Sequence, residues 1–157
     1  LMHHVSLAQG EALFVDAGVV HAYLEGMGLE VMLPSDNVIR AGLTTKYIDR
    51  DEFLSVASLE PSSSPPFVVP QEHGDSLLYS GFPAGFRVYK LSQGGSLSLL
   101  ESHAIVFSDG VRGTVSGAES SVDVTPGQVF FVTASEAKIR FEGEGALWIV
   151  CPEGQQP

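Results

Sequence analysis

The sequence predicts an all-β protein in which short antiparallel strands form a barrel or a sandwich. From residue 67 onward, short runs of strand-forming residues are separated by turn residues, with almost no helical period. Residue types alternate most clearly in 86–91 and 138–142. Asp109-Gly110 and Thr125-Pro126-Gly127 supply turn chemistry. The expected strands are 67–69, 76–79, 86–91, 96–101, 104–108, 113–116, 121–124, 129–133, 138–142 and 146–151.

The composition is that of a folded chain with an acidic surface. Of its 157 residues, 44% are hydrophobic and 17% are charged, which is enough for one domain, or for one small domain and part of another. The formal net charge of -11 disfavours nucleic acid and anionic membrane surfaces as partners, because both attract clustered Lys and Arg. Only eight residues are Lys or Arg, so each one gains weight as a possible contact for an anionic substrate.

The cysteine usage and the absence of long apolar runs bear on location. The single cysteine, Cys151, ends the apolar run Leu-Trp-Ile-Val-Cys, so we expect a buried, inert thiol and no disulfide. No apolar run approaches the ~20 residues of a membrane helix, and no basic segment followed by a hydrophobic one opens the chain. We therefore expect a soluble, cytoplasmic protein that contacts no membrane.

The chain before residue 67 has a different organisation. Short strands are expected at 10–15, 21–24 and 29–33, followed by a short helix that Asp49 caps and that carries Asp51 and Glu52 in its first turn. Residues 58–66 are rich in Pro and Ser and have the composition of a linker. We therefore place a domain boundary at this linker.

The residues expected near His21 indicate a possible metal-binding or catalytic role for this histidine. A lone histidine on an apolar strand is usually a core residue, but Tyr23 follows His21 by two positions and shares its strand face. If Gly26-Met27-Gly28 forms a hairpin loop, Glu30 on the next strand lies near both side chains. An imidazole with a carboxylate suits zinc in an open catalytic site, although no second histidine stands at ligand spacing.

Arg40 and Lys46 lie in the loop-like segment 35–46 and are a quarter of the basic residues. An arginine presents a planar fork to a phosphate group, and a lysine adds a mobile positive charge. The structural alternative, in which Arg40 braces Asp36 or another carboxylate, has equal weight from the residues alone.

Two motifs within residues 10–46 carry a family resemblance. Gly10-Glu-Ala-Leu-Phe14, followed by Ala17-Gly-Val-Val-His-Ala-Tyr-Leu24, is similar to an element of the type I mannose-6-phosphate isomerases. Ser35-Asp-Asn-Val-Ile-Arg-Ala-Gly-Leu-Thr-Thr-Lys46 resembles the arginine-containing signature of that family, at the expected distance. Residues 67–151 resemble the family's C-terminal cupin-like barrel, mainly by strand pattern.

The resemblance implies a zinc-dependent aldose–ketose isomerase that interconverts mannose 6-phosphate and fructose 6-phosphate on a cupin, or jelly-roll-like, fold. By this resemblance, His21 matches a zinc ligand and Arg40 matches the essential arginine. Pocket positions that contact the sugar phosphate are matched by Glu30, Tyr23, Lys46 and Asn37. Arg40 would stabilise negative charge, and Glu30 would either transfer a proton or orient a ligand.

The family's other zinc ligands precede the region that this chain matches. The resemblance therefore implies that residues 1–57 are the closing strands of an incomplete catalytic barrel, that 58–66 are a linker, and that 67–157 form a C-terminal cupin-like barrel. Unpaired strand edges would invite association with another copy. We expect the chain alone to be inactive and to hold zinc poorly. A non-catalytic cupin-like module that binds a sugar phosphate is the alternative, whereas a cupin oxygenase is disfavoured because no 2-His-1-carboxylate spacing is present.

Overall fold

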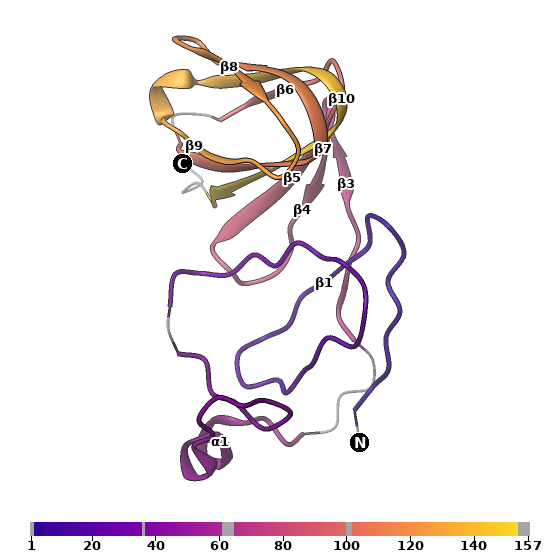
Figure 1. Ribbon diagram of the computed structural model, residues 1–157, viewed down its shortest axis with the longest axis vertical. Coiled ribbons are helices and arrows are strands. Elements are labelled where there is room, and N and C mark those ends of the chain that lie inside the picture. Colours follow the sequence, from indigo (N-terminus) through magenta and orange to yellow (C-terminus); the bar gives the residue numbers. More distant parts are fainter. Residues whose placement is uncertain (1, 36, 61–64, 100–101, 154–157) are drawn as a thin grey trace. The chain divides into compact units, whose positions relative to one another are not determined.

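The computed structural model describes residues 2–35, 37–60, 65–99 and 102–153, and Figure 1 shows its course. The chain divides into two compact units, Leu1–Phe67 and Val68–Pro157. The first unit has little regular structure and the second is a β-barrel, so each is described by itself. No helix within the described ranges is long and apolar enough to cross a membrane.

Among its described residues, the first unit has one short strand pair and one helix. Strand β1 (Ala12–Leu13) pairs with β2 (Phe67–Val68), and α1 (Arg50–Val56) is the only α-helix of the described residues. The strands expected at 21–24 and 29–33 are absent, so that prediction is wrong. A strand needs a neighbouring backbone to satisfy its N–H and C=O groups, and no described segment of this unit pairs with either of them.

Helix α1 forms as its sequence predicts. The Asp49 carboxylate accepts a hydrogen bond from the Glu52 backbone N–H at 3.0 Å, and acidic residues occupy the first turn. The Ala57 N–H donates to the Phe53 carbonyl at 2.9 Å and closes the helix. The Ser58 N–H then donates to the Gly18 carbonyl at 2.9 Å. A Cβ atom at Gly18 would lie 2.7 Å from the Val56 carbonyl oxygen, so this approach requires glycine.

The second unit is an antiparallel sheet that curls into a cupin-like barrel, as the strand pattern predicts. Its main path runs β3-β4-β5-β10-β7-β8, while β6 pairs with β10 and β9 pairs with β7. The short strands are β3 (Gln71–His73), β4 (Ser76–Tyr79), β5 (Phe86–Ser92), β6 (Ser96–Ser98), β8 (Ser121–Val124) and β9 (Val129–Val132). The long ones are β7 (Ala104–Ser116) and β10 (Lys138–Pro152), and a 3-10 turn spans Ala134–Glu136.

The strands expected at 104–108 and 113–116 are one continuous strand, β7, and those expected at 138–142 and 146–151 are one continuous strand, β10. The prediction of a turn at Asp109-Gly110 is therefore wrong. Gly110 has a φ of 64° inside β7, and β7 takes three steps from Arg112 to Asp109 where β10 takes two from Glu144 to Ala146. β7 therefore carries one extra residue, which is a β-bulge that bends both strands. The glycine that indicated a turn instead supplies the left-handed conformation of the bulge. Figure 1 shows β7 and β10 curving together.

The hydrophobic core lies inside the barrel. Alternate residues of each strand point inward, and the largest fully buried side chains include Phe141, Leu91, Ile139, Leu147 and Ile149. Cys151 is buried beside them, as predicted, and burial raises the pKa of its thiol while Arg87 acts in the opposite sense.

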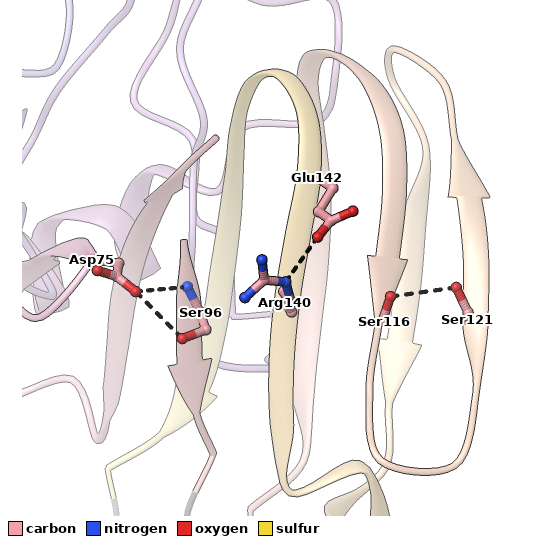
Figure 2. A network of polar contacts seen from close by, with 6 residues as sticks. All are labelled: Asp75, Ser96, Ser116, Ser121, Arg140 and Glu142. Atoms are coloured by element: carbon pink, nitrogen blue, oxygen red, sulfur yellow. Dashed lines mark hydrogen bonds and ion pairs between the residues drawn. The ribbon is translucent and has the colours of Figure 1, made fainter. Parts of the chain in front are cut away.

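A network of polar contacts lies on one part of the outer surface of the barrel (Figure 2). The Asp75 carboxylate accepts from the Ser96 backbone N–H at 3.1 Å and from its hydroxyl at 3.3 Å. Arg140 and Glu142 form an ion pair at 2.9 Å along β10. Ser116 and Ser121 face each other across β7 and β8 at 3.4 Å. This part of the outer surface of the barrel is therefore polar and compatible with exposure to water.

Ser108 is a fully buried hydroxyl that holds a turn onto the barrel. It donates to the Thr125 carbonyl oxygen at 2.7 Å and accepts from the Gln128 backbone N–H at 2.9 Å. We expect Ser108→Ala to lower the free energy of unfolding by about 1 kcal/mol, because the Thr125 carbonyl and the Gln128 N–H both lose a hydrogen bond to the buried hydroxyl. Urea unfolding measures this loss, and Ser92→Ala at an exposed strand end should change it by less than about 0.5 kcal/mol. Equal effects of the two substitutions would contradict this account of Ser108.

Candidate functional site

The first unit brings three of the six candidate site residues together. The Tyr23 hydroxyl donates to Glu30 Oε1 at 3.0 Å, and the His21 and Tyr23 rings lie 5.9 Å apart at an angle of 77°. All three side chains are exposed. The expected proximity of Glu30 to Tyr23 is therefore confirmed. It arises from a loop in which Gly26 has a φ of 106°, and not from a regular hairpin.

His21 is held in one tautomer by the backbone. Its Nδ1 lies 3.0 Å from the Val19 carbonyl oxygen, and a carbonyl oxygen only accepts, so Nδ1 carries the proton. Nε2 then keeps its lone pair, which is the state that a metal-binding histidine requires. Among the described residues, however, no group of three His, Cys, Asp or Glu side chains could hold a metal ion. His21 fits one zinc ligand, and the described residues do not form a complete zinc site.

The contact with Glu30 changes the pKa of Tyr23. The pKa of Tyr23 lies above its ordinary value, first because partial desolvation disfavours the phenolate, and then because the Tyr23 hydroxyl donates a hydrogen bond to the Glu30 carboxylate, whose negative charge repels a phenolate. Tyr23 therefore remains a hydrogen-bond donor over a wider pH range than a free tyrosine.

The other candidate residues lie on the segment that follows. Arg40 is half-buried, and Asn37 and Lys46 are exposed. The ion pairs of the described residues involve neither Arg40 nor Lys46, while Asp36, the alternative partner of Arg40, lies outside the described residues. No hydrogen bond within the described part of the chain joins these three residues to His21, Tyr23 or Glu30.

The second unit also contains a cavity that no sequence motif indicates. It has a volume of about 290 Å³, and its lining includes the apolar residues Val115, Phe130 and Ile139 and the polar residues Thr133 and Glu136. The Ser120 hydroxyl and the backbone N–H groups of Glu119 and Ser120 donate to the Glu136 carboxylate, and these bonds lower its pKa. The lining residues come from several separate segments, so no local motif could have indicated the cavity.

The chain is similar in sequence to known mannose-6-phosphate isomerases. It is 35% identical over 153 residues to the mannose-6-phosphate isomerase of Escherichia coli K12, covering 94% of this chain and 38% of that protein. With the enzyme of Bos taurus it shares 35% over 147 residues, covering 85% of this chain and 34% of that protein. The chain thus spans little more than a third of the length of these curated relatives. No family model matches it.

Solved structures agree with the sequence comparison. Mannose 6-phosphate isomerase from Salmonella typhimurium, bound to fructose 6-phosphate and zinc, has a TM-score of 0.65 and 29% identity, over 78% of this chain and 32% of that one. The zinc-bound form of mannose 6-phosphate isomerase gives a TM-score of 0.63 and 28% identity. The fold and these neighbours define a protein with a cupin-like barrel. More particularly, the comparisons confirm the resemblance to the mannose-6-phosphate isomerases, of which this chain matches a part.

A titration tests the contact between Tyr23 and Glu30. We expect Glu30→Gln to lower the pKa of Tyr23 toward its ordinary value, because the amide brings no charge and accepts more weakly. Part of the upward shift should remain, since burial is its largest cause. Ultraviolet difference spectra of the tyrosinate, assigned with Tyr23→Phe, measure the change. Glu25→Gln, at an exposed acid in the same loop, is the control, and an equal shift in both variants would refute the contact.

Proposed function

We propose that this chain is the C-terminal portion of a zinc-dependent mannose-6-phosphate isomerase and supplies part of its active site. In this proposal Arg40 and Glu30 act on the reacting sugar, His21 binds zinc, and Tyr23, Asn37 and Lys46 contact the substrate. The rest of the site comes from polypeptide beyond these 157 residues.

One coincidence of spacing carries the proposal. Structures of the Salmonella typhimurium enzyme carry alanine in place of a histidine, a glutamate nine positions later and an arginine ten positions after that. His21, Glu30 and Arg40 have the same residue types and the same two intervals. This chain is 33% identical over 150 residues, 94% of its length, to the mannose-6-phosphate isomerase of Salmonella typhimurium, so the matching intervals support equivalent places for the three residues.

The same structures support a site that needs more polypeptide. A glutamate and two lysines that were also replaced by alanine in the Salmonella enzyme precede its histidine by more than a hundred positions. In this chain only twenty residues precede His21. Their counterparts therefore fall outside these residues.

The reaction is a proton transfer between neighbouring carbons. A proton leaves C2 of mannose 6-phosphate and is delivered to C1, while the hydroxyl proton moves from O2 to O1, so no oxidant or reductant is needed. The guanidinium of Arg40 stabilises the negative charge that develops on the oxygens. The Glu30 carboxylate, hydrogen-bonded by Tyr23 at 3.0 Å, accepts a proton or fixes the substrate hydroxyl. His21, protonated at Nδ1, would be one ligand of zinc, which would supply Lewis-acid chemistry when bound.

The zinc content of the chain gives the first test. After dialysis against zinc-free buffer, elemental analysis should find a zinc-to-protein ratio near zero, because one histidine does not retain the ion. Joining the chain to the part of the Escherichia coli relative that it does not match should raise the ratio to near one. In this completed protein, His21→Ala should lose the ion and His73→Ala should keep it. A ratio near one for the isolated chain, with turnover of mannose 6-phosphate, would contradict the proposed division of the site.

The alternative, a non-catalytic module that binds sugar phosphates, is favoured by the absence of a complete metal cluster among the described residues. Arg40→Ala in the completed protein separates the two functions. For an isomerase we expect kcat/KM to fall roughly 10²–10³-fold, the usual loss when one oxyanion-stabilising group is removed, with Arg112→Ala on β7 as the control. If the completed protein only binds, it will show no turnover, and Arg40→Ala will weaken its affinity for the sugar phosphate instead.

A further inference from the structure

The outer surface of the barrel carries an apolar face that extends over five strands. Residues that lie directly opposite each other across antiparallel strands point to the same side, so the register defines which side chains are neighbours. Two adjacent rows cross β9, β7, β10, β5 and β4; they are Phe131, Ile105, Val150, Val88 and Tyr79, and Val129, Phe107, Trp148, Lys90 and Leu77. We call these ten residues the outer apolar face.

These side chains point away from the core. The residues that alternate with them, such as Ile149, Val106 and Val132, belong to the buried cluster inside the barrel. Four members of the face are exposed: Val129 at 63%, Phe131 at 62%, Ile105 at 51% and Leu77 at 37%. The single charged member, Lys90, places its ammonium 5.3 Å from the centre of the Trp148 ring, where the π-electrons stabilise it. Tyr79 and Val88 are already buried, at 3% and 8%, so the exposed apolar surface of the face lies on β9, on β7 and at Leu77, with almost no free charge.

The other ends of β7 and β10 have a polar outer surface, which can be compared with the outer apolar face. Beyond the bulge, the outward residues of β10 are Lys138, Arg140, Glu142 and Glu144, and those of β7 are Arg112, Thr114 and Ser116. Figure 2 shows Arg140 paired with Glu142 and Ser116 facing Ser121 in this region. A sheet that faces water on one side alternates apolar and polar residues. The two strands follow that rule on one side of the bulge and break it on the other, which indicates that the outer apolar face is covered in the working protein.

The size of the face indicates what covers it. The face is five strands wide at about 4.8 Å per strand, and its two residues on each strand occupy about 6.8 Å each along the strand. Its area is therefore roughly 300 Å². Separate proteins that associate stably bury about 800 Å² per partner, so the face is too small to hold a second copy firmly. A segment joined by peptide bonds needs less area, because its effective concentration is in the millimolar range.

We infer that the outer apolar face packs against the portion of the isomerase polypeptide that lies outside these 157 residues. The inference rests on the proposed function, in which such a portion completes the protein. The chain covers 38% of its Escherichia coli relative, so ample polypeptide exists in that family to supply the partner surface.

The experiment compares one double substitution in two proteins. Ile105→Ser with Phe131→Ser should lower the melting temperature of the completed protein by about 5 °C or more, because two large side chains lose their burial. In the isolated chain the same pair should shift it by less than about 2 °C, since both side chains are already exposed. Val122→Ser, at an exposed valine of β8 outside the face, should have a small effect in both proteins.

A second measurement does not depend on a stable variant. Trp148 is the sole tryptophan of this chain and lies within the face, so acrylamide quenching of its fluorescence reports whether the face is covered. In the completed protein, its contribution is obtained by difference from Trp148→Phe. Quenching should be weaker there than in the isolated chain.

The outcomes separate this inference from the proposed function. Equal shifts of the melting temperature in both proteins, or equal quenching, would overturn the inference even if the completed protein isomerises mannose 6-phosphate. Dimerisation of the isolated chain that Phe131→Ser abolishes would identify a second copy as the occupant and would also overturn it. A large difference between the two proteins without any turnover would support the packing and refute the proposed function.

Discussion

The extra residue that β7 carries at Gly110 lets two long strands serve four neighbours. Before the bulge β7 pairs with β9 and after it with β8, while β10 pairs with β6 and then with β5. The same residue restores the inward direction of Val111 after Ser108, so both halves of the strand supply the core. A straight pair of strands would have left one half of the barrel without a partner sheet. The bend thus determines the closure of the barrel, its core and the two contrasting parts of its surface.

The two units differ in what holds them together. All fully buried residues of the described chain belong to the barrel, and none of the described residues of the first unit is buried. Ordering the backbone costs about 1–2 kcal/mol per residue, and apolar burial is the main term that offsets this cost. The first unit has local contacts, such as the Asp49 cap and the Ser58–Gly18 hydrogen bond, but no core. Its large exposed side chains, including Tyr23, Leu24, Met27 and Leu43, are the surface that such a core would use.

The sequence predicts local structure correctly where one short segment determines it. The Asp49 cap, β4 and the buried Cys151 follow from neighbouring residues alone, and the family resemblance is confirmed by the curated relatives. The errors lie where distant segments decide. Asp109-Gly110 has the composition of a turn, but its partner strand continues through Ala146, so the glycine serves a bulge. Residues 29–33 have the composition of a strand, but no neighbouring strand is present to pair with them. The roles of the candidate site residues stay predictions, because no contact of the described residues joins His21, Tyr23 and Glu30 to Arg40.

The position of the candidate residues links stability to chemistry. Catalysis requires reacting groups to be held to within a fraction of an ångström, since small displacements cost large factors in rate. His21, Tyr23, Glu30 and Arg40 all lie in the first unit, none of whose described residues is buried, whereas the barrel that holds the core carries none of them. The contacts that they do make, from His21 to the Val19 carbonyl and from Tyr23 to Glu30, orient side chains over short distances along the chain but do not fix the unit as a whole. Any polypeptide that covers the exposed apolar side chains of this unit therefore supplies its core and fixes the geometry of its site in the same step.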